Sequence, residues 1–253
     1  MFEAVQSKKQ ITTMNAQDVI NELWKFSDKA YALHHAKFFK CFKGGYGDIN
    51  DIFCGINAAN LRHTAKKFYN KISLEETAVL LKEHLHEART AALIMLTNRF
   101  DKAAIEEKTQ IVDIYLKHTK YINNWDLVDV SVYKILGRYA YETGSYEILR
   151  VLSSGGFLWE ERMSVVANWY LIHKGEFALI VELCEKFLTH KHDLMHKACG
   201  WMLREMGKVS DEGYKELLEF LEKHRLKMPR TMLRYAIERL SFEQRAYFMG
   251  KSK

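Results

Sequence analysis

The stretch MHKACGW at residues 195–201 decides the fold, because its pattern recurs along the chain. Residues 87–93 (EARTAAL), 160–166 (EERMSVV) and 232–237 (MLRYAI) share it: a long basic residue stands two places before a small or β-branched one, and an apolar run follows. The basic residues are Arg89, Arg162, Lys197 and Arg234, and Asp126 fills the double gap between the first two. The intervals are 37, 36, 35 and 37 residues. Such a period is typical of helix pairs that stack into a solenoid.

The composition also favours an all-α protein. The 253 residues are 48% hydrophobic and include only one Pro and 13 Gly, and the apolar residues recur at helical spacing. Residues 43–50, with three Gly, predict a loop, whereas helix starts are indicated by Asn15 with Asp18, Ser73 with Glu76, and Ser210. The period is shorter than a typical HEAT unit, and tetratricopeptide and ankyrin signatures are missing. We therefore predict an all-α, HEAT-like helical-repeat solenoid, a superhelix of stacked antiparallel helix pairs, forming one domain over residues 1–253.

Cysteine usage and hydropathy indicate the compartment. The four cysteines are scattered, with no CxxC pair, which suits a reducing cytoplasm: Cys41, Cys54, Cys184 and Cys199. Residues 1–10 have no apolar signal-peptide core, and no run of 18 uncharged apolar residues occurs. We expect a cytoplasmic protein that neither is secreted nor spans a membrane.

The positive charge is unevenly distributed. The net charge is +6; residues 1–185 hold 23 basic and 23 acidic residues, and residues 186–253 hold 15 and 9. Such a concentration is typical of a surface for an anionic partner, with nucleic acid the first candidate. The alternative is a solvated, lysine-rich helical surface without a partner.

Four residues form the candidate site. Trp125 and Asp129 stand four apart, on one face of a helix whose N-cap is Asn124. Arg162 and Trp201 follow at about one and two repeats, so all four lie at one level of three consecutive helices, over roughly 16–20 Å. A row of that length on a concave solenoid surface suits a DNA strand better than a small-molecule pocket. The structural alternatives are core tryptophans, a solvated carboxylate, and an arginine paired with Glu161 or Asp129.

Several motifs around these residues resemble one family. They are WDLVD (125–129), WEER (159–162), KACGWMLRE (197–205), GGYGD (44–48), FCGI (53–56) followed by Arg62, and HEARTAAL (86–93). Together they are similar to the DNA alkylation repair family of HEAT-like DNA glycosylases, the AlkD type. The resemblance runs from about residue 37 to about residue 240. Ala59 replaces a usual proline and Asn50 a common glycine, and both positions are peripheral to the candidate site.

The resemblance implies excision of N3- and N7-alkylated purines, such as 3-methyladenine and 7-methylguanine, from duplex DNA without a cofactor or metal. It assigns Asp129 to stabilise the sugar oxocarbenium ion and place a water. Trp125 and Trp201 would pack against the deoxyribose and backbone. Arg162 would grip phosphate, with Lys197 and Arg204 as further phosphate ligands. It also implies catalysis without a tight base pocket, and therefore tolerance of bulky adducts.

Other functions remain open at this stage. One is a non-catalytic protein that binds distorted or branched DNA through the same groove. Another is a protein-interaction scaffold, which repeat folds often provide. A zinc site at His192 and His196, with His190 and Cys199 nearby, is a weaker alternative. We expect a monomer that associates with the nucleoid when bound to DNA.

Overall fold

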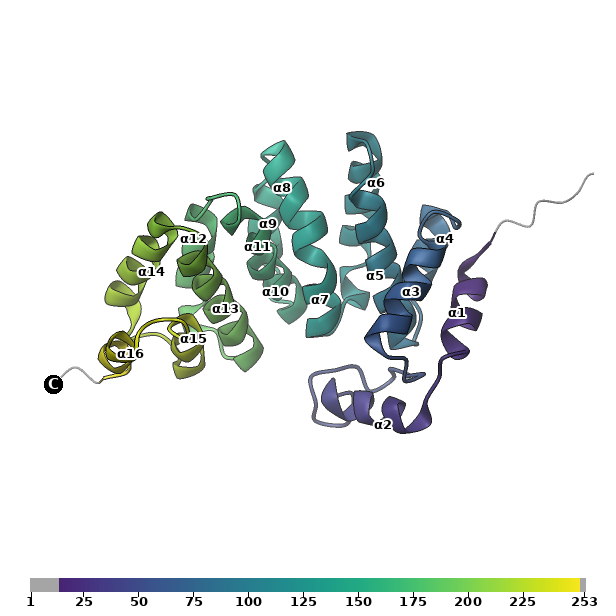
Figure 1. Cartoon of the computed structure of the whole chain (residues 1–253), viewed down its shortest axis with the longest axis horizontal. Coiled ribbons are helices and arrows are strands. Elements are labelled where there is room, and N and C mark those ends of the chain that lie inside the picture. The colour runs from purple at the N-terminus through teal and green to yellow at the C-terminus, as the bar shows by residue number, and fades with distance from the viewer. Residues whose placement is uncertain (1–13, 251–253) are drawn as a thin grey trace, which may run out of the picture.

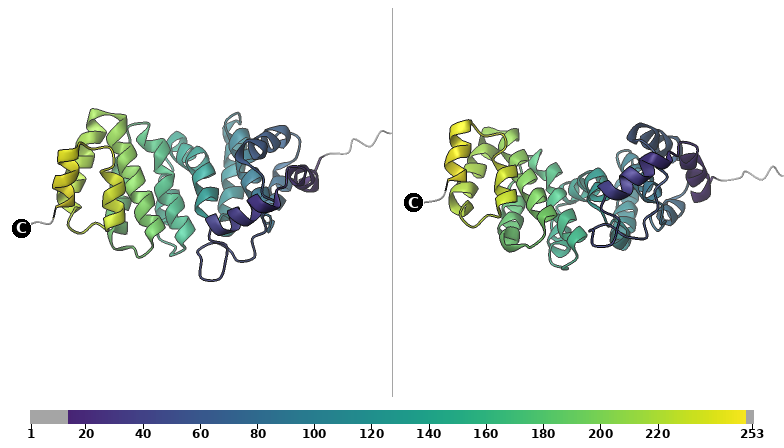
Figure 2. Two further views of the ribbon diagram at one scale, coloured as in Figure 1. Left: turned by 60° about the horizontal axis from the view of Figure 1, so that its bottom comes forward. Right: turned by 90° about the horizontal axis from the view of Figure 1, so that it is seen from below.

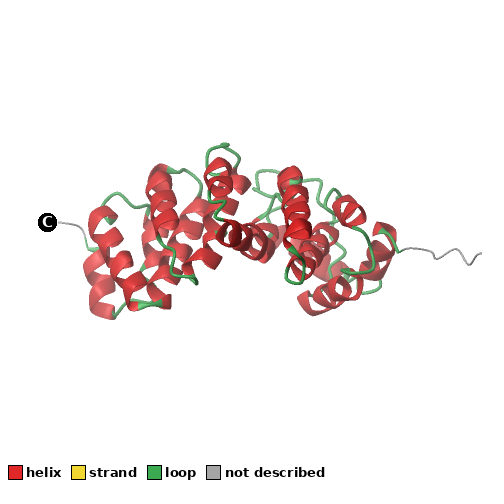
Figure 3. Ribbon diagram, turned by 90° about the horizontal axis from the view of Figure 1, so that it is seen from above, coloured by secondary structure: helices red, strands yellow, loops and turns green. Residues whose placement is uncertain are grey.

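The computed structural model describes residues 14–250, and its regular elements over this range are helices. Strands are absent from this part of the chain, which contains a single isolated β-bridge, between Ile52 and Leu85. The expectation about residues 1–10 lies outside the described residues. The helices form an elongated, curved stack that begins at α1 and ends at α16 (Figures 1, 2 and 3).

One row of helices carries the repeated motif. Each member packs against the next: α3 (Ala58–Phe68), α5 (His86–Phe100), α7 (Trp125–Val132), α10 (Leu158–Val166), α13 (Asp193–Val209) and α15 (Arg230–Ala236). Two helices of this row are extended, α7 through the π-helical turn Tyr133–Gly137 (η2) into α8 (Arg138–Thr143), and α10 into α11 (Asn168–Ile172). The five repeat positions identified in the sequence fall on α5, α7, α10, α13 and α15. The predicted period is therefore confirmed.

A second row of helices packs against the first. Its members each pack against a helix of the first row: α4 (Leu74–Leu80), α6 (Ile105–Lys117), α9 (Glu147–Leu152), α12 (Ala178–Lys186) and α14 (Asp211–His224). The two ends are α1 (Ala16–Trp24), which packs on α3, α4 and α5, and α16 (Phe242–Met249). The predicted HEAT-like solenoid is confirmed.

Helix α2 (Lys29–Phe38) departs from the repeat. None of its residues is fully buried, and it lies crosswise at the ends of the first-row helices (Figure 1). Hydrogen bonds hold both ends of α2. The side-chain amide of Asn124 donates to the carbonyl oxygen of Phe39 at 2.9 Å, and the backbone N–H of Asp28 donates to Cys54 O at 3.0 Å. Gly55 has a φ of +78°, and a Cβ there would lie 2.1 Å from Asp28 O, so glycine is required. The predicted loop over residues 43–50 follows α2.

The predicted helix starts are also present. Asn15 forms a reciprocal capping box with Asp18, and Ser73, Ser210 and Asn124 each accept a backbone N–H at the start of their helices. These bonds satisfy backbone donors that have no partner within the helix. The starts of α1, α4, α7 and α14 are therefore encoded locally.

The apolar core runs through the whole stack, from Ala16 to Phe248. Two helices of the first row approach closely at Gly200, which has no side chain. A Cβ added at Gly200 would lie only 2.5 Å from Met232 O and from Tyr235 Cβ. This glycine of the KACGW motif lets α13 and α15 approach closely. All four cysteines are buried and free. Over residues 14–250 no helix combines the length and apolar character needed to cross a membrane.

Candidate functional site

Asp129 and Arg162 form the centre of the site. Asp129 lies on α7, and Arg162 reaches it from the neighbouring α10. Arg162 donates from Nε to Asp129 Oδ1 at 3.0 Å and from Nη2 to Oδ2 at 2.7 Å, while Nη1 donates to Leu194 O at 2.7 Å. The arginine side chain is 5% exposed and that of Asp129 is 19% exposed. The buried cation therefore fixes the plane of a carboxylate that still reaches solvent.

The charge of Asp129 is set by two opposing effects. Burial raises the pKa of this carboxyl above its ordinary value, and the charge and hydrogen bonds of Arg162 lower it in part. Each oxygen accepts one N–H from Arg162, so each keeps a further lone-pair site for a ligand. The side chain can therefore act as an oriented hydrogen-bond acceptor.

Trp125 begins α7, one turn before Asp129, as the sequence predicted. Its backbone N–H donates to the side chain of Asn124 at 2.8 Å. The indole is half-buried, and its ring centroid lies 5.6 Å from each of the rings of Phe38 and Phe39, at the end of α2. Helix α2 thus supplies an aromatic flank to the site that the spacing of the sequence did not reveal.

The other predicted residues lie on α13. Trp201 is half-buried against the core, Lys197 pairs with Asp193 at 2.8 Å, and Arg204 pairs with Glu238. Over residues 14–250 no hydrogen bond or ion pair joins these three side chains to Asp129. The structure therefore brings together Asp129 and Arg162, with Trp125 on the preceding turn. It places the three α13 residues one or two helices away.

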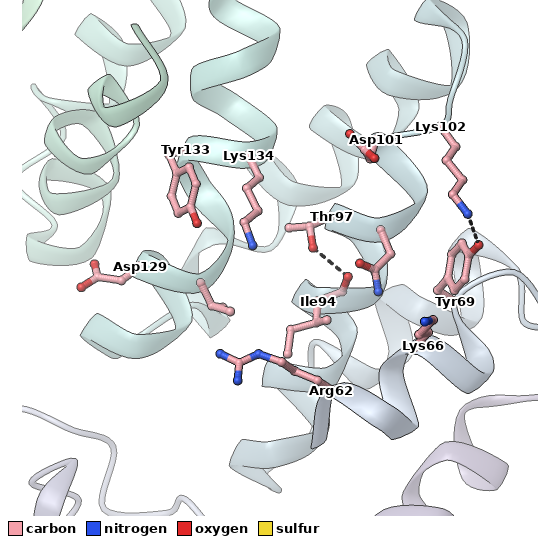
Figure 4. A pocket seen from close by; sticks show the side chains of 12 residues that line it. Arg62, Lys66, Tyr69, Ile94, Thr97, Asp101, Lys102, Asp129, Tyr133 and Lys134 are labelled. Atoms are coloured by element: carbon pink, nitrogen blue, oxygen red, sulfur yellow. Dashed lines mark hydrogen bonds between the residues drawn. The ribbon is translucent and has the colours of Figure 1, made fainter. Parts of the chain in front are cut away.

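Asp129 stands at the edge of an open groove of about 640 Å³ (Figure 4). Its polar wall includes four cations contributed by α3, by the turn after α5 and by η2: Arg62, Lys66, Lys102 and Lys134. The second acid in the groove, Asp101, is exposed and pairs with Arg138 at 2.7 Å. A neighbouring hollow of about 390 Å³ shares Tyr133 and Lys134 and continues toward Trp169 on α11. The groove therefore joins a basic wall to the oriented carboxylate.

Most of this wall was not predicted from the sequence. Of the four cations only Arg62 was singled out, as part of the family resemblance. All four come from residues 1–185, where basic and acidic residues balance along the chain. The available signal was the spacing of Arg62, Lys66 and Tyr69, which places the two cations on one face of α3 and the tyrosine at its C-cap.

A buried polar cluster holds the start of α7. His86 contacts Asp51 Oδ2 at 3.0 Å through Nδ1 and Asp126 Oδ2 at 2.8 Å through Nε2. Arg89 donates to the same Asp51 oxygen at 2.5 Å and to Asn123 Oδ1 at 2.9 Å. Burial opposes the charge on His86, but the carboxylates of Asp126 and Asp51 outweigh it and raise its pKa to about 9. His86 is therefore an imidazolium at neutral pH.

Glu87 ties the segment after α2 to α5. Its carboxylate accepts the N–H of Cys54 at 3.1 Å and that of Gly55 at 2.9 Å. Burial opposes ionisation, yet neighbouring His35 and these amides lower the pKa of Glu87. The FCGI and HEARTAAL motifs are thus parts of one buried joint that positions α2 against α5 and α7.

The histidines near α13 are engaged in local contacts. His190 Nε2 lies 3.0 Å from Glu161 Oε2, His196 Nε2 lies 2.6 Å from His190 O, and His192 Nδ1 accepts the N–H of Leu194. Within residues 14–250, no three His, Cys, Asp or Glu side chains are grouped so that they could hold a metal ion.

Fold and site together define a HEAT-like repeat protein with a basic groove beside an arginine-held carboxylate. The sequence model of the DNA alkylation repair enzymes matches residues 19–240, and the chain belongs to this family. A solved structure described as a predicted DNA alkylation repair enzyme from Enterococcus faecalis superposes with a TM-score of 0.66. It shares 16% identity over 85% of this chain and 97% of its own, so this likeness concerns the fold alone. No curated protein sequence matches the chain.

Proposed function

We propose that this protein is a DNA glycosylase that releases N3- and N7-alkylated purines from duplex DNA. The observation that carries the proposal is the carboxylate of Asp129, oriented by Arg162 at the edge of the cation-lined groove. The family, DNA alkylation repair, supplies the substrate class. The protein would act as a cytoplasmic monomer without a cofactor.

The groove would hold the DNA backbone. Arg62, Lys66, Lys102 and Lys134 can contact phosphates, which position a duplex without reading its sequence. Because the guanidinium of Arg162 is engaged by Asp129 and Leu194, its role here is to position the carboxylate. A direct grip on phosphate would require Arg162 to exchange one of these bonds.

The chemistry needs a stabilised cation and a placed water. An alkylated purine carries positive charge, so the C1′–N bond breaks with its electron pair going to the base, and the sugar becomes an oxocarbenium ion. The Asp129 anion stabilises this ion, and its free lone-pair site accepts a hydrogen bond from the attacking water. The water oxygen bonds to C1′, its proton passes to the carboxylate or to solvent, and an abasic site remains. Trp125 lies one turn away, where its ring can pack against the sugar.

The test is release of 7-methylguanine from a duplex with one such base, scored as alkali-labile sites, beside DNA binding measured at several salt concentrations. Release together with steeply salt-dependent binding is the expected result. Salt-dependent binding without release would indicate the non-catalytic DNA-binding protein instead. Absence of both would contradict any action on DNA and favour the scaffold.

A further inference from the structure

Helix α2 and the turn after it carry positive charge that has no counter-charge in the described part of the chain. Residues 29–43 include four lysines and no acidic residue: Lys29, Lys37, Lys40 and Lys43. All four are exposed, and within residues 14–250 none has a carboxylate partner, whereas Lys25 and Lys67 on either side of this segment both pair with Glu22. None of the four belongs to the groove beside Asp129. Such a run of cations attracts a polyanion.

The same helix exposes a row of rings. Tyr31, His34 and Phe38 recur at helical spacing on one face, with successive ring centroids 6.0 Å apart and successive ring planes within 15° of parallel. Tyr31 is 41% exposed, Phe38 is 51% exposed, and Leu33 on the same helix is 62% exposed. Because apolar side chains gathered on a surface mark an interaction site, α2 has the features of a binding element and not those of a core helix.

The row of rings adjoins the candidate site. The ring centroid of Phe38 lies 5.6 Å from that of Trp125, and Tyr31 and Trp125 both line a hollow of about 360 Å³ between α2, α3, α5 and α7. Arg62 and Val130 line this hollow and the groove as well, so the hollow separates α2 from the groove. Helix α2 lies across the ends of the first-row helices (Figure 1) and therefore borders the surface that carries Asp129.

We propose that α2 is a DNA-binding ridge, whose lysines contact phosphates and whose row of rings packs against the sugars of a duplex that the groove cations hold from the other side. The inference rests on the proposed function for its choice of ligand. It deepens that function, because excision without a base pocket leaves backbone contacts to hold the damaged nucleotide at Asp129. The ten residues of α2 rise about 15 Å, or roughly four base pairs at about 3.4 Å each.

A pair of lysines on α2 tests the contact with phosphates. Lys29→Gln/Lys37→Gln removes two exposed cations, and the control Lys71→Gln/Lys215→Gln removes two exposed cations from the turn after α3 and from α14. Binding to an undamaged duplex is measured at several salt concentrations. The slope of log K against log salt should become shallower by about 2 in the α2 variant and keep its native value in the control. An unchanged slope in the α2 variant, or an equal change in the control, would overturn the proposal and favour a protein partner for α2.

A second substitution tests the contact of the rings. Phe38→Leu removes a ring and keeps an apolar side chain against Trp125, and the control is Phe242→Leu, at a position 74% exposed on α16. Phe38→Leu should weaken duplex binding about three- to tenfold without changing the salt slope, because an aromatic contact contributes beyond the area that it buries. Equal affinities of Phe38→Leu and Phe242→Leu would overturn the contact between the rings and DNA.

Parallel release of 7-methylguanine separates this proposal from the proposed function. Release by the native protein, with no change of the salt slope in the α2 lysine variant, leaves the glycosylase standing and removes the ridge. A shallower slope in that variant, without release by the native protein, supports the ridge and contradicts the glycosylase.

Discussion

Two carboxylates three residues apart on α7, Asp126 and Asp129, occupy similar positions and differ in what surrounds them. Their side chains are 17% and 19% exposed, and each is held by a buried cation from an adjacent helix. Asp126 is held by His86 from α5 and lines a hollow of about 360 Å³ between α2, α3, α5 and α7. Asp129 is held by Arg162 from α10 and lines the open groove.

The difference lies in the permanence of the cation. Arginine keeps its charge at every accessible pH and orients a carboxylate through two parallel bonds, whereas histidine can lose its proton. The carboxylate assigned to the chemistry has the permanent partner. The one that fixes the start of α7 belongs to a network that can titrate.

Removing the permanent partner should have the largest effect on folding. Arg162→Met leaves Asp129 with no counter-charge, and breaking a buried pair in this way costs about 3–5 kcal/mol. Urea denaturation measures the loss of unfolding free energy. The control is Arg150→Met, which breaks an exposed pair with Glu182 and should cost no more than about 1 kcal/mol. Equal losses of unfolding free energy in the two variants would show that the buried Arg162–Asp129 pair stabilises the fold no more than an exposed pair does.

Raising the pH should weaken the other network. The folded-state pKa of His86 is about 9, against 6.5 for an unperturbed histidine. Its contribution is complete below pH 6.5 and is lost as the pH rises to about 9, by on the order of 3 kcal/mol. Denaturation of the native protein at several pH values measures this loss. Asp126→Asn removes one carboxylate that raises the pKa of His86, so it should move the loss to lower pH. Constant stability between pH 6.5 and 9 would contradict this account of the cluster.

The smallest expected effect concerns the cations that line the groove beside Asp129. The double variant Lys66→Gln/Lys134→Gln removes two groove cations, and each phosphate contact contributes about 0.9 to the salt slope of binding. The slope of log K against log salt should become shallower by about 2. The control is Lys71→Gln/Lys117→Gln, at exposed positions outside the groove. An unchanged slope in the groove variant would place the DNA elsewhere.

The repeat was predictable because it is written at regular intervals in the sequence. Each of Arg89, Asp126, Arg162 and Lys197 falls on the expected first-row helix, and local caps such as Asn124 mark the starts. Helix α2 could not be placed in this way. It has no buried face to generate a period, and its position depends on contacts such as that between Asn124 and Phe39, which are 85 residues apart.

The site was predictable in its members and not in their pairing. Spacing placed Trp125, Asp129 and Arg162 on adjacent helices, but left open whether Arg162 faces phosphate, Glu161 or Asp129. The partner of Arg162 depends on how closely α7 and α10 pack, to within the length of a hydrogen bond. Only the packed structure gives that distance. The basic groove was missed for a similar reason, since charges that balance along the chain are segregated in space.

The central claim is that Asp129 carries out the chemistry, and the most direct test is single-turnover release of 7-methylguanine by the native protein, Asp129→Asn and Asp113→Asn. Asp113 is an exposed carboxylate on second-row helix α6, so its substitution controls for the loss of one negative charge. We expect Asp129→Asn to bind the duplex nearly as tightly as the native protein and to release base about 10²–10³-fold more slowly, with Asp113→Asn unchanged. Release by Asp129→Asn at a rate close to the native one would contradict the account.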